Sequence, residues 1–145
     1  MLHHLTLWVP DLARAERSWS WLLGCLGYER DGGLDTVALF RHGDGFSVAL
    51  EQSSDMVPGM LYSRFRPGLN HLAFRVDDEA TLADIVDGAR GFGWSELPTN
   101  DLHPIAGGAD VVYLEDQDGF EVELVRAPSP RDERVTPKGS DFDRA

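Results

Sequence analysis

Hydrophobic and polar residues alternate near the start of the chain and again near its middle. In residues 2–11, LHHLTLWVPD, aliphatic side chains occupy every second position, and His4 and Trp8 fall on the opposite side of an extended segment. Residues 69–78, LNHLAFRVDD, repeat the pattern with His71 in the place of His4. The repeat predicts two related strands, each with an apolar face and a polar face.

Each of these strands is followed by apolar residues at spacings of three and four, which is typical of an amphipathic helix. Asp11 is placed to cap the first helix, which is expected to end at Gly27. Asp77 or Asp78 is placed to cap the second helix. Trp19 lies on the apolar stripe of the first helix and is therefore expected in the core.

Three short segments with strand character follow each predicted helix, separated by turn sequences such as DGG, HGDG and EDQDG. Both halves of the chain therefore follow the order strand, helix and three strands, which predicts an α+β fold. The expected later strands are 27–30, 35–41 and 45–51 in the first half, and 94–97, 109–114 and 119–126 in the second half.

This repeat divides the chain into four segments. The two predicted modules are residues 1–51 and 69–126. An inter-module linker, residues 52–68, contains several apolar side chains and is expected to line a cleft or to pack at a dimer contact. Residues 127–145 are rich in proline and charge, which favours a flexible tail.

Composition narrows the classes of partner. The 145 residues have a formal net charge of −12, which would repel nucleic acids and anionic membranes, so a small molecule or another protein is the expected partner. The single cysteine, Cys25, is expected to be a buried thiol, and no disulfide framework can form within the chain. Neither a signal peptide nor a membrane span is recognised, and we therefore expect a cytoplasmic protein.

Candidate metal ligands lie on the polar faces of the predicted strands. The last strand of each half carries a glutamate, Glu51 or Glu123, on the face opposite its aliphatic residues. With His4 and His71 on the first strands, the two halves offer two imidazoles and two carboxylates. Each of these residues alone is more often a surface polar group, but inward-facing carboxylates without a cation would repel one another. The set therefore favours a divalent transition metal.

The paired openings HHLTLWVPDL and NHLAFRVDD and the closing EDQDGFEVELV resemble the vicinal oxygen chelate superfamily, which includes glyoxalase I, extradiol dioxygenases and bleomycin resistance proteins. This resemblance covers residues 2–126. It implies two tandem βαβββ modules that form a half-open, incomplete β-barrel with helices on the outside, often as a homodimer. It also implies one divalent ion of nickel, cobalt, manganese, iron or zinc, with the ligands His4, Glu51, His71 and Glu123.

Three functions remain open within this resemblance. A glutamate at the Glu51 position is similar to the ligand set of lyase and isomerase members, which makes a metal-dependent lyase or isomerase the first hypothesis. Extradiol-type dioxygenases use two histidines and one glutamate. Bleomycin-resistance-type proteins sequester an antibiotic, usually without the metal ligands.

Five residues are candidates for direct roles in such a reaction. Glu123 or Glu51 could act as the base that removes a substrate proton, and His103 in a loop rich in proline and glycine is a further candidate. Trp8 and Arg75 share the faces of the predicted histidine ligands and are candidates for substrate binding. Trp8 could instead form a wall of the barrel, Arg75 could pair with a nearby acid, and His103 could lie on the surface.

Overall fold

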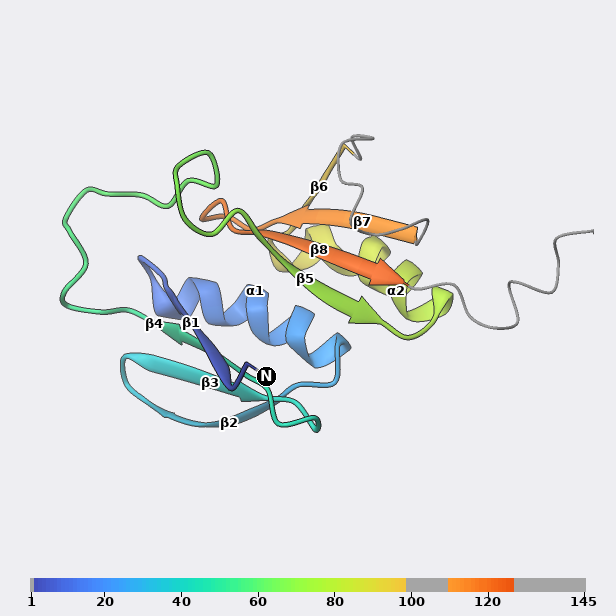
Figure 1. Cartoon of the computed structure of the whole chain (residues 1–145), viewed down its shortest axis with the longest axis horizontal. Coiled ribbons are helices and arrows are strands. Elements are labelled where there is room, and N and C mark those ends of the chain that lie inside the picture. The colour runs from blue at the N-terminus through green and yellow to red at the C-terminus, as the bar shows by residue number, and fades with distance from the viewer. Residues whose placement is uncertain (1, 99–109, 127–145) are drawn as a thin grey trace, which may run out of the picture.

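The chain builds the same unit of one strand, one helix and three strands twice (Figure 1). The structure is a computed structural model and describes residues 2–98 and 110–126. The first module consists of β1 (His4–Trp8), α1 (Leu12–Cys25), β2 (Glu29–Leu34), β3 (Val37–Arg41) and β4 (Ser47–Glu51). The second consists of β5 (His71–Val76), α2 (Glu79–Ala89), the short 3-10 helix η1 (Arg90–Phe92), β6 (Ser95–Leu97), β7 (Asp110–Glu115) and β8 (Glu121–Arg126).

Each module forms its own four-stranded mixed sheet. The strand orders are β1-β4-β3-β2 and β5-β8-β7-β6. In both sheets the first strand runs parallel to the last, while the remaining neighbours are antiparallel. The predicted α+β fold of two βαβββ modules is confirmed, and the two sheets do not close into one barrel.

Both helices begin at the aspartates that the sequence offers as caps. The Asp11 side chain accepts a hydrogen bond from the backbone of Arg14 at 2.9 Å. In the second module the cap is Asp78, which accepts from the backbone of Thr81 at 2.9 Å. Such a cap stabilises a helix by about 1 kcal/mol because it satisfies a backbone donor that has no partner within the helix.

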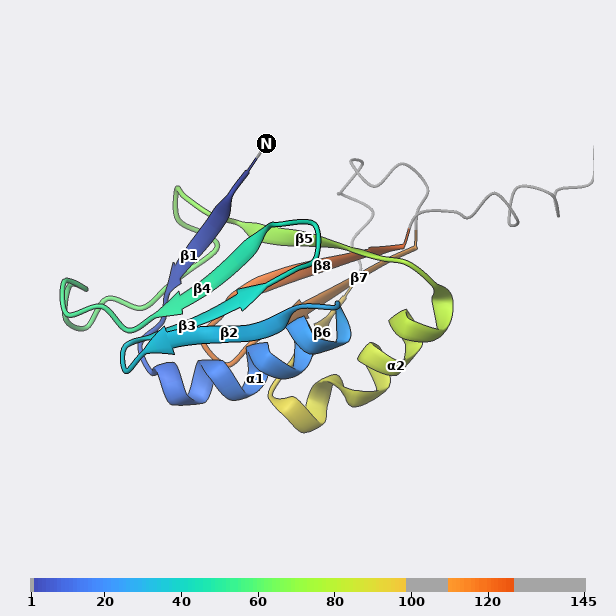
Figure 2. The same ribbon diagram turned by 90° about the horizontal axis from the view of Figure 1, so that it is seen from below.

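Two buried tryptophans join the modules through their helical sides. Trp19 on α1 is fully buried, as predicted, and contacts Trp94 edge to face with ring centroids 5.2 Å apart. The Trp19 indole also donates to the Asp116 carboxylate at 2.9 Å, and Trp94 donates to the Ser18 carbonyl at 3.0 Å. Figure 2 shows α1 and α2 side by side on the same side of the two sheets. The opposite face of each sheet, called here the helix-free face, remains open.

Three further expectations from the sequence concern Cys25, His103 and the tail. Cys25 is exposed, so the expectation of a buried thiol is wrong, because it falls at the last residue of α1 and off the buried stripe. His103 and the tail 127–145 lie outside the described residues. Within the described part of the chain, neither helix has the length and apolar character needed to cross a membrane.

Candidate metal centre

The second module brings His71 and Glu123 together on its helix-free face. β5 and β8 are parallel neighbours, and Glu123 pairs with Ala73, two residues beyond His71. The distance between His71 Nε2 and Glu123 Oε2 is 3.0 Å. Both side chains are largely shielded from solvent, with exposed fractions of 21% for His71 and 7% for Glu123. A histidine and a carboxylate meet here in a place where water has limited access.

Asn70 orients the His71 ring from the other side. The distance from Asn70 Oδ1 to His71 Nδ1 is 2.8 Å, and the Asn70 amide nitrogen donates to the Arg64 carbonyl at 3.1 Å. This second bond fixes which end of the amide is oxygen, so His71 Nδ1 must be the donor to Asn70. With the proton on Nδ1, the Nε2 atom that faces Glu123 carries the lone pair. A histidine with this arrangement is prepared to bind a metal.

Tyr113 on β7 holds the second oxygen of Glu123. The register pairs Tyr113 with Glu123, and the phenol donates to Glu123 Oε1 at 3.0 Å. Burial of the phenol, followed by the hydrogen bond to and the charge of Glu123, raises the pKa of Tyr113 to about 12. Tyr113 therefore remains a hydrogen-bond donor at neutral pH. The alternation of β7 could have placed Tyr113 on this face from sequence, but sequence analysis did not select Tyr113 or Asn70.

The separation of the two donor atoms can be compared with metal geometry. Nitrogen and oxygen ligands lie about 2.1 Å from a divalent transition metal, so two ligands at a right angle are about 3.0 Å apart. The distance of 3.0 Å between His71 Nε2 and Glu123 Oε2 matches that value. The imidazole and the carboxylate therefore fit as two neighbouring ligands of one divalent ion.

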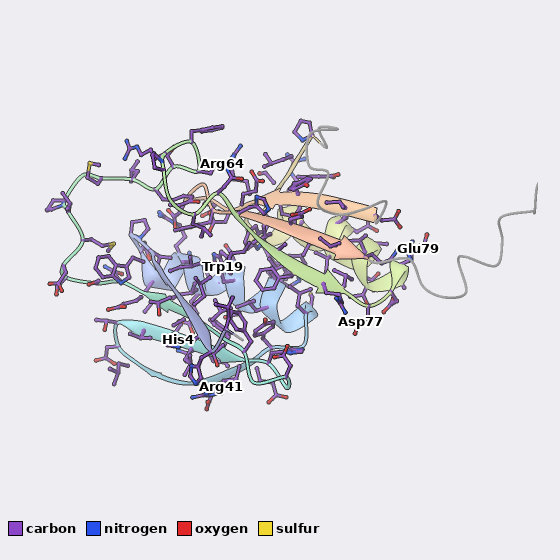
Figure 3. All side chains as sticks on the ribbon, in the orientation of Figure 1. His4, Trp19, Arg41, Arg64, Asp77 and Glu79 are labelled. Carbon is purple, nitrogen blue, oxygen red and sulfur yellow. The ribbon has the colours of Figure 1, made fainter. Side chains whose placement is uncertain are left out.

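The first module presents its predicted ligands differently. His4 is exposed at the start of β1 (Figure 3), and its Nδ1 lies 2.8 Å from Nδ1 of His3. His3 immediately precedes β1, and its carbonyl accepts a hydrogen bond from the backbone of Ser47 at 3.3 Å. Glu51 accepts a hydrogen bond from the indole of Trp8 at 3.0 Å. Trp8 is 47% exposed, which leaves ring surface available for a ligand.

The strand registers show that Glu51 is not the structural counterpart of Glu123. Two residues beyond His71, Ala73 pairs with Glu123. Two residues beyond His4, Thr6 pairs with Ala49, whereas Glu51 pairs with Trp8. Ala49 therefore occupies the position that corresponds to Glu123. Glu51 still lies on the helix-free face because it is displaced by two residues along β4.

The two pairs of predicted ligands lie on separate sheets. The chain brings His71 together with Glu123, but it does not bring His4 and Glu51 to them. Across residues 2–98 and 110–126, no group of three or more His, Cys, Asp or Glu side chains is arranged to hold a metal ion. Arg75 is exposed on the same face as His71.

Two βαβββ modules with a histidine and a carboxylate on an open sheet face define a glyoxalase-like protein. A sequence model of the glyoxalase/bleomycin resistance protein/dioxygenase superfamily matches residues 3–113 of the chain. The chain therefore belongs to this superfamily.

Individual relatives support the same assignment. The uncharacterized protein YqjT of Bacillus subtilis (strain 168) is 35% identical over 130 residues, which cover 88% of this chain and 99% of YqjT. A Bacillus halodurans protein provisionally assigned as a glyoxalase has a crystal structure with a TM-score of 0.75 and 32% identity, covering 88% of this chain and 96% of the other. A glyoxylase/bleomycin resistance protein/dioxygenase domain from Frankia sp. EAN1pec, at 24% identity, shares the fold with a TM-score of 0.65 over 88% of this chain and 98% of the other.

Proposed function

We propose that this protein is a metal-dependent enzyme whose small substrate chelates the metal through vicinal oxygens, and that it catalyses a lyase or isomerase reaction. The observation that carries the proposal is the His71–Glu123 pair, with its donor atoms 3.0 Å apart and each residue oriented by a second hydrogen bond. Members of the superfamily commonly bind a metal. The expected cofactor is one divalent ion of nickel, cobalt, manganese, iron or zinc.

Each candidate residue would have a separate role in the proposed reaction. His71 and Glu123 hold the metal, which supplies Lewis acidity at the oxygens of the substrate. Glu123 is shielded from water and can accept a proton from a neighbouring C–H bond, as could Glu51 if a second chain brings it to this site. Tyr113 keeps one oxygen of Glu123 in place during the reaction. Trp8 offers an exposed ring on which a substrate could rest.

We further propose that the full ligand set is assembled in a homodimer. The pair His71–Glu123 and the residues His4 and Glu51 lie on separate sheets of one chain. The helices already pack together on one side, so both helix-free faces remain available to a second copy (Figure 2). In such a dimer, His4 of one chain would approach His71 and Glu123 of its partner.

A second candidate function is an extradiol-type dioxygenase reaction. The observation in its favour is the strand register, because Ala49 and not Glu51 corresponds to Glu123. His4, His71 and Glu123 would then form a set of two histidines and one carboxylate. This set leaves several positions open at the metal and is typical of iron(II) oxygenases.

The first experiment is elemental analysis of protein purified without chelators and without a metal-binding tag. We expect close to one equivalent of divalent metal per chain, with loss of the metal in His71→Ala and Glu123→Ala. Glu96→Ala is the matched control. Glu96 is an exposed glutamate on β6, and because it pairs with the core residue Leu114, it lies on the face of the sheet away from His71 and Glu123. Absence of metal after reconstitution with excess nickel, cobalt, manganese, iron and zinc would refute the enzyme proposal and favour antibiotic sequestration.

The Glu51→Ala variant separates the two enzyme candidates. Loss of the metal would identify a four-ligand centre, as expected for a lyase or isomerase. Full retention of the metal would identify a three-ligand centre and favour the dioxygenase. Substrate screening with the reconstituted protein would then begin with the corresponding class.

Mixing two variants tests the dimer. His4→Ala and His71→Ala homodimers each lack one ligand in every site, but a mixed dimer with sites between chains has one intact site. Visible absorption of bound cobalt(II) should therefore reappear at half the parental amount per mixed dimer. If each site is contained within one chain, mixing restores no absorption, and the dimer proposal fails.

A further inference from the structure

A cavity lies beside the His71–Glu123 pair, between the inter-module linker and the β6–β7 edge of the second sheet. Its volume is about 260 Å³. Residues that line it and bear on its chemistry are Arg64, Phe65, Asn70, Leu97, Tyr113 and Glu121. Tyr113 contributes to this wall and also donates to Glu123. Asn70 also lines the cavity and contacts His71 Nδ1. The cavity therefore adjoins the candidate metal centre through two shared side chains.

The linker side of the cavity is fixed to the second module by three interactions. The Tyr62 ring stacks on Phe120 with centroids 4.1 Å apart, and the Tyr62 hydroxyl donates to the Leu69 carbonyl at 2.6 Å. Arg64, which reaches from the linker toward the second sheet in Figure 3, forms an ion pair with Glu121 at 2.9 Å. These contacts fix the part of the linker around Tyr62 and Arg64 to the second module, so this part of the cavity wall is formed before any ligand arrives.

Charges around the cavity favour some ligands over others. The Arg64 guanidinium is shared by two carboxylates, because it pairs with Glu115 as well as with Glu121. The three groups together have a net charge of −1, and the Glu121 side chain is only 8% exposed. Arg64 therefore offers no uncompensated positive charge to a ligand. A carboxylate or phosphate placed beside the buried Glu121 would be repelled in a region of low dielectric.

Apolar side chains line the cavity next to Glu121. Phe65 is 85% exposed, and the Arg64 guanidinium lies 4.8 Å from the centroid of its ring. Leu97 on β6 also lines the cavity. A ligand that covered the Phe65 ring would remove apolar surface from water, which favours binding. The cavity is smaller than the roughly 300–1,000 Å³ of sites for drug-sized molecules, so the ligand should be compact.

We propose that this cavity is a substrate subsite for a compact apolar or aromatic group that carries a hydrogen-bond donor, either an amine or a hydroxyl, and that it rejects carboxylates and phosphates. The apolar group lies between Phe65 and Leu97, and the donor group binds Glu121. The assignment of the ligand as a substrate rests on the proposed function, because it places the reacting end of the ligand near Glu123.

Three probes that share a 4-fluorophenyl ring and differ in their polar group test the selectivity of the cavity for donors over anions: 4-fluorobenzylamine, 4-fluorobenzyl alcohol and 4-fluorobenzoate. Binding to the metal-free protein is followed by fluorine NMR at about 0.15 M salt, where a Debye length of about 8 Å limits the attraction of the distant negative charges for the amine. We expect the amine and the alcohol to bind at least tenfold more tightly than the benzoate. Binding of the benzoate as tight as that of the amine, or no binding of any probe, would overturn the proposal.

Variants locate the binding of the probes. Glu121→Gln removes a negative charge from the cavity and should therefore reduce the preference for the amine and the alcohol over the benzoate. Glu96→Gln should leave this preference unchanged, because Glu96 lies on the other face of β6. Phe65→Ala alters an exposed side chain, so the fold should survive, and all three probes should bind several-fold more weakly. Unchanged probe binding in both Glu121→Gln and Phe65→Ala would place the probes elsewhere and refute the subsite.

Metal titration of the same samples keeps the two proposals separate. If metal binds at His71 and Glu123 but the probes show no selectivity, only the subsite proposal fails. If the probes bind with the expected selectivity but no metal binds, the cavity stands as a binding site and the metal-dependent function fails.

Discussion

Replacement of Tyr113 by phenylalanine would test whether the second module is built as a metal centre. The substitution removes the hydroxyl that donates to Glu123 Oε1 at 3.0 Å and leaves the ring that fills the same space. Glu123 is 5% exposed, so water cannot easily replace the lost donor. The carboxylate would then be less well fixed for a metal ion.

The expected loss of metal affinity in Tyr113→Phe follows from the role of the hydroxyl. Loss of a group that orients a metal ligand typically weakens metal binding by about 10–100-fold. With about 1.4 kcal/mol for each factor of ten, this corresponds to about 1.4–2.8 kcal/mol of binding free energy. A hydrogen bond to a charged group contributes about 1.5–3 kcal/mol to stability, which sets a similar scale for the loss of folding free energy.

Calorimetric titration with cobalt(II) or nickel(II) measures the change in affinity, and thermal unfolding measures the change in stability. Tyr28→Phe is the matched control, because it removes a half-buried tyrosine hydroxyl from the first module. Its metal affinity should equal that of the parent. If Tyr113→Phe binds metal within twofold of the parent while remaining folded, the hydroxyl does not position a ligand, and the orienting role of Tyr113 is refuted.

The remaining predictions concern ionisation and folding. The pKa of Tyr113 is raised from 10 to about 12, so the folded chain retains this proton more strongly than the unfolded chain. Its contribution to stability is present below pH 10 and is lost as the pH rises to about 12, and an ultraviolet titration of the parent minus Tyr113→Phe should show this late step. Trp19→Phe should destabilise the chain by about 1–3 kcal/mol in chemical denaturation, because it removes a donor from the buried Asp116. Burial raises the pKa of Asp116 above 3.8, so ionisation of this carboxyl lowers the stability of the fold as the pH rises from 3.8 through the raised pKa. The Trp19 indole stabilises the ionised carboxylate. The loss of unfolding free energy in Trp19→Phe should therefore be larger at pH 7 than near pH 4. Asp78→Ala should lower the free energy of unfolding by about 1 kcal/mol, and an unchanged value would refute the capping role. Gly88→Ala should destabilise the contact between the helices, because a Cβ atom there would lie 2.8 Å from Trp21, and unchanged thermal unfolding would show that the indole can move aside.

Sequence alone determined the order of the elements and the faces of the strands that carry the candidate ligands. It placed a turn at DGG after a strand at 27–30, whereas β2 (Glu29–Leu34) runs through that sequence. The alternation around His4 and His71 is a local property, since successive side chains of a strand point to opposite sides whatever the strand pairs with. Helix caps and the apolar stripe that contains Trp19 are local in the same sense, and the structure confirms both. The sequence therefore placed the predicted metal ligands on polar faces without any knowledge of the neighbouring strands.

Only the tertiary structure decided which of these side chains meet. The offset that puts Ala49 in the place corresponding to Glu123 depends on the register between strands whose paired residues are 43 apart in the first module and 50 apart in the second. Both glutamates satisfy the same alternation. The pairing of linker residue Arg64 with Glu121 joins segments with no common periodicity. Long-range pairing of this kind is set by the combined packing of the whole chain, and local patterns of hydrophobic and polar residues do not encode it.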